Sequence, residues 1–201
     1  MFQFENDYTL ENHRVRLSPL MQHHIDPLFE VSQNPEIWKY FTEAGMGREN
    51  FERYCTNAFK QRKKRSEYPL VIFDKAPKAY VGLTRIYDIN SGLGNAKIGH
   101  TWIGRASQGT GLNKNCKFLL FKFLFDTLNF KRVGFGASAE NTRSIHAMKS
   151  VGCSQEGVLR SFLPNLTKTG RADIVLMSML QEEWEESAKR NLLKKIENMQ
   201  K

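Results

Sequence analysis

The clearest chemical signal in the sequence is a short loop with two glycines, Gln108-Gly109-Thr110-Gly111, which stands before a long apolar segment. Glycine adopts positive φ without steric cost and lets another molecule approach the main chain closely. The helix expected after Gly111 begins with N–H groups that lack internal partners, and its dipole adds partial positive charge. The loop therefore predicts a site for a phosphate or pyrophosphate group.

Two named phosphate motifs are excluded at this loop. A P-loop requires Gly-Lys-Ser or Gly-Lys-Thr where this chain has Gly109-Thr110-Gly111, and the dinucleotide fingerprint requires glycine or alanine at Lys114. A tight connection between a strand and a helix uses glycines in the same way. The loop by itself thus leaves a purely structural role open.

The strand that must position this loop is predicted over residues 98–104. Alternation divides its side chains between two faces. One face carries Ile98, His100 and Trp102, and the other carries Gly99, Thr101 and Ile103. The loop then lies at the carboxyl end of a strand, where open α/β sheets bind their ligands.

The apolar segment after the loop is predicted to be a helix over residues 112–129. Its polar residues follow one narrow stripe, formed by Asn115, Lys122, Asp126 and Asn129. Leu and Phe occupy nearly all of the remaining surface, as in a helix that packs against a sheet over most of its girth.

The other predicted elements alternate between strands and helices. Strands are expected around residues 15–20, 70–73, 80–87, 132–139, 156–162 and 173–180, and helices over residues 22–40, 48–65 and 142–151, with a charged helix from Glu182. Asn34-Pro35 interrupts the first helix, and Asn141 and Gly152 bound the short one. The alternation predicts an α/β domain around a mixed sheet. We expect one domain over residues 1–201, with residues 182–201 as a charged helical extension.

Composition narrows the class of protein. Lys and Arg exceed Asp and Glu by 30 to 21, a net charge of +9 that suits an anionic ligand or partner. The three cysteines are far apart, without a Cys-x-x-Cys pair or a signal peptide, so we expect a reduced, cytoplasmic setting. No apolar run reaches the roughly 20 residues of a membrane span. Metal binding by His23, His24 and Asp26 is disfavoured because adjacent helical side chains diverge by about 100°, and no metal is expected.

Three stretches resemble the GNAT superfamily of acetyl-CoA-dependent N-acetyltransferases, most closely the branch related to RimJ and RimL, which acetylates ribosomal-protein amino termini. The run Gln108-Gly109-Thr110-Gly111-Leu112-Asn113, after its strand, resembles the superfamily's pyrophosphate motif. Asn141-Thr142-Arg143-Ser144 resembles the second motif of this branch, and the run from Ser154 to Arg160 resembles the strand after it. Asn113 and Asn115 depart from the pattern, which has Gly or Ala and often Glu at these positions.

The resemblance implies a single domain of class α/β (α+β), with a central mixed, mostly antiparallel sheet flanked by helices. It implies acetyl-CoA as cosubstrate. Backbone groups of Trp102, Ile103 and Gly104 would pair with the pantetheine arm. The loop would hold the pyrophosphate through Gln108, Gly109, Thr110, Gly111, Leu112 and Asn113. Asn141 would bond the pantetheine, and Ser144 would lie near the sulfur.

The reaction implied is direct attack of a neutral amine on the thioester, with Ser144 as candidate acid and His100 and Glu156 as candidate bases. Asn141 as a helix cap, His100 as a packing residue and Glu156 as a turn residue stay open as structural readings. The expected acceptor is a protein or peptide amino terminus. A small amine acceptor and a catalytically silent acyl-CoA-binding protein are the alternatives. Nucleic acid is not required, and association with the ribosome or as a homodimer stays open.

Overall fold

A single eight-stranded sheet runs through the computed structural model, which describes residues 2–199. Its strands stand in the order β1-β2-β3-β4-β5-β6-β8-β7, and each pair is antiparallel except β5 with β6. The strands are β1 (Leu10–Glu11), β2 (Val15–Pro19), β3 (Glu67–Asp74), β4 (Ala79–Asn90), β5 (Asn95–Ile103), β6 (Arg132–Ser138), β7 (Ser154–Pro164) and β8 (Arg171–Leu180). The mixed, mostly antiparallel sheet confirms the predicted fold class.

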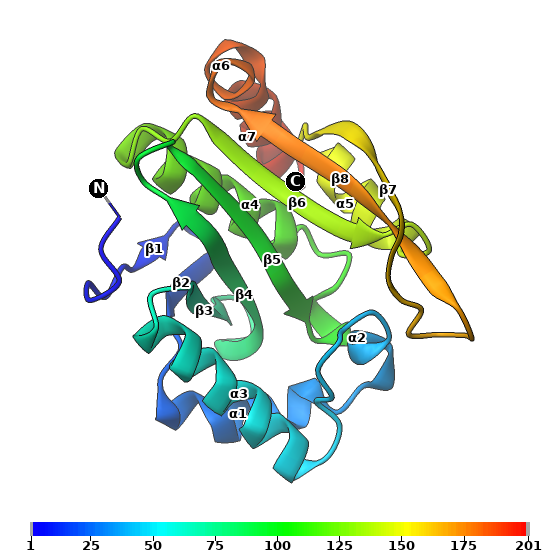
Figure 1. Ribbon diagram of the computed structural model, residues 1–201. Helices are drawn as coiled ribbons and strands as arrows, with labels where there is room; N and C mark the ends of the chain where they lie inside the picture. The colour runs from blue at the N-terminus through cyan, green and yellow to red at the C-terminus, as the bar shows by residue number, and fades with distance from the viewer. Residues whose placement is uncertain (1, 200–201) are drawn as a thin grey trace.

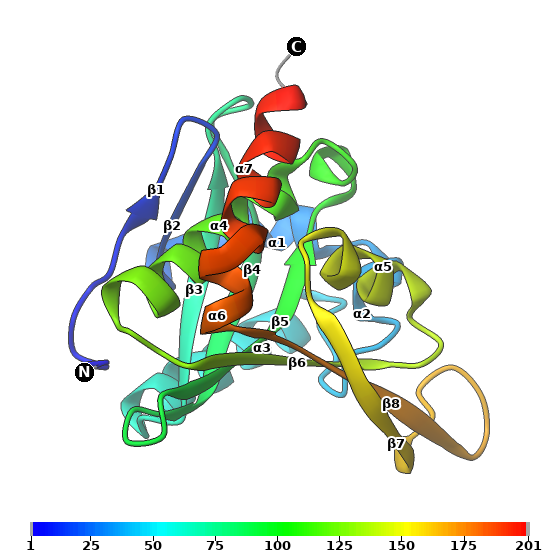
Figure 2. The same cartoon turned by 90° about the horizontal axis from the view of Figure 1, so that it is seen from above.

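Helices cover both faces of the sheet. The first group is η1 (Gln22–His24), α1 (Ile25–Ser32), α2 (Pro35–Trp38) and α3 (Arg48–Lys63). The second is η2 (Arg105–Ser107), α4 (Leu112–Phe121), η3 (Lys122–Thr127), α5 (Thr142–Ser150), α6 (Gln181–Glu183), η4 (Trp184–Ala188) and α7 (Lys189–Asn198). Seen from above, α4, α5 and α7 lie in front of the sheet, and α1 and α3 lie behind it (Figure 2).

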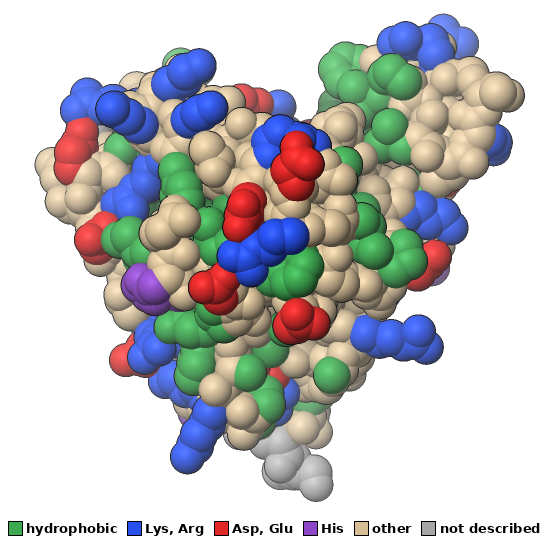
Figure 3. Space-filling view, turned by 90° about the horizontal axis from the view of Figure 1, so that it is seen from below, with side chains coloured by type: hydrophobic (Ala, Val, Ile, Leu, Met, Phe, Trp, Pro, Cys, Tyr) green, Lys and Arg blue, Asp and Glu red, His purple; other side chains and the backbone are tan. Residues whose placement is uncertain are grey.

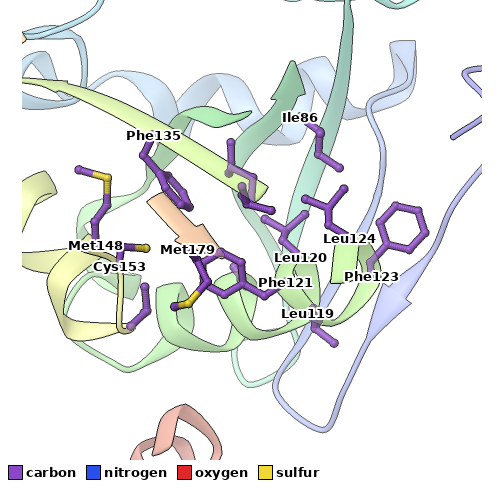
Figure 4. Packing of buried hydrophobic residues seen from close by; sticks show 14 of the residues in the cluster. Ile86, Leu119, Leu120, Phe121, Phe123, Leu124, Phe135, Met148, Cys153 and Met179 are labelled. Carbon is purple, nitrogen blue, oxygen red and sulfur yellow. The ribbon is translucent and has the colours of Figure 1, made fainter. Parts of the chain in front are cut away.

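Two hydrophobic clusters hold these layers together. The larger one joins α4, α5 and the C-terminal helix to the sheet, and its centre is the apolar side of α4 and η3 with Phe135, Met148 and Met179 (Figure 4). The smaller one joins α1, α2 and α3 to the opposite face. Because both faces are covered, β3 reads as a nearly continuous apolar run, Leu70-Val71-Ile72-Phe73, with alternate residues in different clusters.

Element boundaries agree with the sequence expectations to within a few residues, and the short strand β1 is an element that they lack. Local signals account for the agreement. The side chain of Asn34 accepts a hydrogen bond from the N–H of Glu36 and so caps the start of α2. Pro35 suits the first position of this helix, because an N–H there would have no partner within the helix. The C-terminal helix is amphipathic, and its Trp184 is fully buried with its indole N–H donating to Asp126 at 2.8 Å.

The one parallel pairing is short. β5 pairs with β6 over only three residues, Asn95 to Lys97 against Arg132 to Gly134. Beyond these pairs the two strands diverge toward their carboxyl ends (Figure 1). In the described chain no strand pairs with residues 98–103 on that side, and we call this stretch the open edge of β5.

The predicted alternation of side chains along β5 is wrong at its centre. Trp102 packs in the cluster under α1 and α3, whereas Ile98 and Ile103 both pack in the cluster under α4. The cause is a β-bulge: the register with β4 shifts here, and His100 has φ of 48°. A bulge adds one residue to the strand, so the side chains beyond it exchange faces. Ile98 and Trp102 therefore lie on opposite faces of the sheet.

Candidate active site

The loop between β5 and α4 presents free backbone donors. Gly109 and Gly111 have φ of 78° and 83°, in the left-handed region that glycine adopts without strain. Within residues 2–199, the N–H groups of residues 109–114 donate to no acceptor. Six consecutive N–H groups without an acceptor, at the N-terminus of a ten-residue helix, are donors suited to an anion.

A buried carboxylate fixes the position of this loop. Asp74, at the end of β3, is 1% exposed. It accepts a hydrogen bond from the hydroxyl of Ser107 at 3.2 Å and forms an ion pair with Arg14 at 3.0 Å. Arg14 in turn reaches the hydroxyl of Thr110 at 3.4 Å. The same contacts that anchor the loop therefore place a guanidinium group beside its free N–H groups.

Gln108 connects the loop to the two strands that diverge. Its amide N–H₂ donates to the carbonyl of Ile103, at the end of β5, at 2.7 Å. Its side-chain carbonyl accepts a hydrogen bond from Arg143, in the first turn of α5 after β6. The backbone N–H of Gln108 is taken by the carbonyl of Arg105. Gln108 thus contributes through its side chain, which links the end of β5 to the start of α5 where β5 and β6 have moved apart (hereafter the divergence).

The backbone at the end of β5 is partly engaged within the sheet. The N–H of Gly104 donates to Val81 at 2.7 Å, and its carbonyl accepts from Ser107 at 3.0 Å. In an antiparallel ladder alternate residues face opposite edges, so Gly104 and Trp102 face β4. Of the three predicted strand residues, Ile103 is the one whose N–H faces the open edge.

Leu112 and Asn113 complete the predicted cosubstrate site at the start of α4. Leu112 is fully buried and anchors the helix in the core. The side-chain oxygen of Asn113 is shielded from solvent and has no hydrogen-bond partner among the described residues. A buried polar atom without a partner is costly, so this oxygen is suited to accept a donor from a bound molecule.

Asn141 and Ser144 lie at the start of α5. The side-chain oxygen of Asn141 accepts the N–H of Ser144 at 3.1 Å, which makes Asn141 the N-cap of the helix. Its amide N–H₂ and the hydroxyl of Ser144 donate to no acceptor within residues 2–199. Because β5 and β6 are parallel, this helix start and the glycine loop meet at the same end of the sheet.

His100 lies at the bulge, on the side of the sheet opposite to α4 and α5. Its ring is 5.6 Å from that of Tyr87 and 6.3 Å from that of Phe41. Burial, and then the positive charge of Arg85, lower the pKa of His100 to about 4. Arg85 is 1% exposed and forms an ion pair with Glu67 at 2.8 Å. The imidazole is therefore neutral near pH 7 and can accept a proton.

Glu156, the other candidate base, lies apart from these residues. It is on β7 and forms an ion pair with Arg132, at the end of β6 where β6 still pairs with β5. It also accepts the hydroxyl of Ser178 at 2.9 Å, and the Arg132 guanidinium holds its pKa below the usual range. The structure brings His100, Ser144, Asn141 and the loop to the divergence and leaves Glu156 at the paired end.

The cysteines are buried and supply no accessible nucleophile. Burial raises the pKa of Cys55, Cys116 and Cys153 to about 12 in each case. Within residues 2–199, no three His, Cys, Asp or Glu side chains gather closely enough to ligate a metal ion. None of the helices in that range has both the length and the apolar character needed to cross a bilayer.

Sequence reasoning misses four residues around the divergence: Arg14, Glu67, Arg85 and Lys117. Three of them carried no signal, because their roles depend on contacts between distant segments. Lys117 did carry one. It is a charged residue that lies off the polar stripe of its helix, within the run Cys116 to Leu120, and the structure buries it.

Comparisons with known proteins agree with this geometry. The model of the acetyltransferase (GNAT) domain matches residues 14–154. The uncharacterized N-acetyltransferase p20 of Bacillus licheniformis is 25% identical over 181 residues, which cover 88% of this chain and 98% of p20.

The solved structures that share the fold include two acetyltransferases bound to forms of coenzyme A. RimJ of Mycobacterium smegmatis, in complex with CoA-disulfide, has a TM-score of 0.77 at 19% identity and covers 94% of this chain and 93% of its own. Spermidine N-acetyltransferase of Vibrio cholerae, in complex with CoA and spermine, has a TM-score of 0.71 at 21% identity and covers 87% and 100%.

Proposed function

The chain belongs to the GNAT family of N-acetyltransferases and is thus an acyltransferase, and on this premise we propose that it transfers acetyl from acetyl-CoA to the α-amino group of a peptide or protein. The observation that carries the proposal is the meeting of three features at one end of the sheet. These are the free N–H groups of residues 109–114, the open edge of β5 and the neutral imidazole of His100.

The residues around the divergence suit coenzyme A. The N–H groups of residues 109–114 would hold the pyrophosphate, with Arg14 and Arg143 close by as cations. The N–H of Ile103 would pair with the pantetheine arm as a neighbouring strand does. The unpartnered oxygen of Asn113 and the amide of Asn141 would complete its polar contacts.

Two side chains on opposite sides of the open edge would move the protons. When bound, acetyl-CoA supplies an activated acetyl group as a thioester. His100, on the side of α2 and α3, would accept the proton that the amine loses. Ser144, on the side of α5, would donate to the leaving sulfur. This division agrees with the positions of the two residues, since His100 would face the incoming amine and Ser144 the departing thiol from different sides of the open edge.

The modest basicity of the site favours an α-amine. An α-amino group has a pKa near 7.7–8.0, so deprotonation at pH 7 costs about 1 kcal/mol, whereas a lysine side chain near 10.4 costs about 4–5 kcal/mol. A histidine with a pKa of about 4 is a weak base. An amine that is already partly neutral at pH 7 can react without a strong base to remove its proton.

The acceptor side also offers a group for a single ammonium ion. Phe41 lies beside His100, and Glu43, two residues further on, has a carboxylate oxygen shielded from solvent without a partner among the described residues. This oxygen is suited to bind the amine before it loses its proton. Tyr40 donates to the carbonyl of Glu140 at 3.1 Å and joins this loop to the start of α5.

A small polyamine is the second candidate acceptor, favoured by the likeness to the spermidine enzyme. Enzymes usually recruit such cations with a strongly acidic surface. On the face formed by α1 and α3, Asp and Glu side chains are interspersed with Lys and Arg (Figure 3). Three of these acids pair with arginines: Asp26 and Glu52 with Arg48, and Glu49 with Arg53. The surface therefore favours the peptide over the polyamine.

A kinetic comparison tests the proposal. We would measure kcat/KM with acetyl-CoA for a peptide with a free amino terminus, for the same peptide with a blocked terminus and a free lysine, and for spermidine, between pH 6 and 9. The free amino terminus should be the best substrate at pH 7. A higher kcat/KM for spermidine would identify a small amine as the preferred acceptor. If no amine were acetylated, the protein would be a catalytically silent acyl-CoA-binding protein.

A further inference from the structure

A buried lysine that the proposed chemistry does not use lies directly beneath the divergence. Lys117 belongs to α4 and is 6% exposed. Its ammonium group donates to the hydroxyl of Thr101, on β5, at 3.2 Å, and lies 5.4 Å from the centre of the Phe135 ring, on β6. Phe135 is the first residue of β6 beyond the last pair with β5. The ammonium is thus held between the two strands at the point where their pairing has ended.

The ammonium group is poorly satisfied in the protein alone. Among residues 2–199, Thr101 is the one hydrogen-bond acceptor that it reaches, and the same hydroxyl is shared with Thr84 at 2.8 Å. A lysine ammonium has three N–H donors, so two of them lack an acceptor. No carboxylate of the described chain pairs with it.

The groups that face Lys117 confirm the lack of a counter-charge. On its own helix the neighbour is Cys116, and from the segment after α5 it is Cys153, both with their pKa raised to about 12 and therefore uncharged. From β5 and β6 it meets the Thr101 hydroxyl and the Phe135 ring, neither of which carries charge. Burial accordingly lowers the pKa of Lys117 to about 8.

A charge buried at this cost with unused donors is suited to a ligand that supplies acceptors. The open edge of β5 is where the proposed function places the pantetheine arm, whose carbonyl oxygens are such acceptors. We propose that Lys117 is a cosubstrate-binding residue whose ammonium group donates a hydrogen bond to a carbonyl oxygen of the pantetheine arm. This inference rests on the proposed use of acetyl-CoA and adds the residue that would hold its arm from beneath the sheet.

The test compares two ligands and two variants by calorimetry. Acetyl-CoA contains the arm, whereas 3′-phosphoadenosine 5′-diphosphate has the same nucleotide without it. Lys117→Met should weaken acetyl-CoA binding about 10-fold or more, as expected for a lost hydrogen bond from a charged group, and leave the arm-less nucleotide unaffected. Lys122→Met, at an exposed lysine of the same helical segment, should change neither affinity.

Stability distinguishes binding from a structural role. Removal of an unpaired buried ammonium should leave the denaturation midpoint unchanged or raise it. The proposal would be overturned if the folded Lys117→Met variant bound both ligands more weakly by the same factor, or if its affinity for acetyl-CoA were unchanged. If the wild-type protein bound neither ligand, the acetyl-CoA assignment itself would fall, and the role of Lys117 with it.

Proton uptake provides a second measurement on the wild-type protein. At pH 8.5 a lysine with a pKa of about 8 is largely neutral, and a carbonyl partner would favour its charged form. Acetyl-CoA binding should then take up a fraction of a proton, as seen from calorimetry in buffers of different ionisation enthalpy, whereas the arm-less nucleotide should not. Equal uptake with both ligands would contradict the proposal.

Discussion

Arg143, in the first turn of α5, donates a hydrogen bond to the side-chain carbonyl of Gln108, in the loop after β5. This contact joins the two segments that follow the diverging strands, and it places an exposed guanidinium beside the free N–H groups of residues 109–114. The arginine therefore has a partner in the free protein and a second one, a phosphate, in the proposed complex.

Arg143→Ala should weaken acetyl-CoA binding several-fold, because a cation near the phosphates is lost. Since the guanidinium is exposed to solvent, the loss should shrink as salt is raised toward 0.5 M. Arg48→Ala, which removes an exposed arginine of α3, is the matched control and should leave the affinity unchanged. Binding by Arg143→Ala that equals the wild type at low salt would contradict this role.

Gly109→Ala should raise the KM for acetyl-CoA. The φ of Gly109 is 78°, and a Cβ there would meet open space, so the substitution costs only the strain of the left-handed region, about 1–2 kcal/mol. Gly170, in the β7–β8 turn, has φ of 101° and equally open surroundings. Gly170→Ala should thus lose similar stability with no change in KM. Equal KM values for the two variants would show that the loop does not hold the cosubstrate.

Asn141→Ala should lower stability and cosubstrate affinity together. It removes the cap that accepts the N–H of Ser144, which costs about 1 kcal/mol, and it removes the amide proposed to bond the pantetheine. Asn34→Ala removes the equivalent cap of α2. Urea denaturation should detect both losses, whereas the KM for acetyl-CoA should rise only in Asn141→Ala. A cap without any ligand contact would give unchanged KM in both.

The depressed pKa of His100 predicts how stability depends on pH. The folded protein binds this proton near pH 4, whereas the unfolded chain binds it near the ordinary value of 6.5. Between these values the unfolded chain holds more protons, so the free energy of unfolding falls as pH falls from 6.5 to 4. His24 has a similarly lowered pKa and contributes in the same direction.

His100→Gln should therefore retain part of this pH dependence and lose the rest. Denaturant titrations at pH 7, 6, 5 and 4 would measure it. The His100→Gln variant should also have a lower kcat at pH 7 if His100 accepts the amine proton. Ser144→Ala should lower kcat as well, because the leaving sulfur would lose its hydrogen-bond donor. An unchanged slope between pH 6.5 and 4 would mean that His100 is not buried as the structure has it.

Local signals in the sequence accounted for the fold and the loop. Periodicity and helix-end residues such as Asn34, Asn141 and Gly152 act within a few residues of where they stand, so element boundaries were predictable. The β-bulge at His100 was not, because it depends on the register with β4. That one inserted residue moved Trp102 to the other face of the sheet.

Part of the candidate site was also predictable from the sequence, and part was not. The glycine loop and the start of α5 are continuous stretches, and their meeting follows from the parallel β5 and β6. The placement of Glu156 in an ion pair with Arg132, and of Arg85 with Glu67, depends on residues that are distant in sequence. Periodicity cannot supply such contacts, which is why the candidate bases could not be separated before the structure.

Competition between two amines of one peptide shows directly whether the protein prefers an α-amino group. A short peptide with a free amino terminus and one internal lysine would be incubated with the protein and acetyl-CoA at pH 7, and the acetylated position would be read by tandem mass spectrometry at low conversion. Acetyl should appear on the α-amino group, because that amine is partly neutral at this pH. Acetyl found first on the lysine side chain would contradict it.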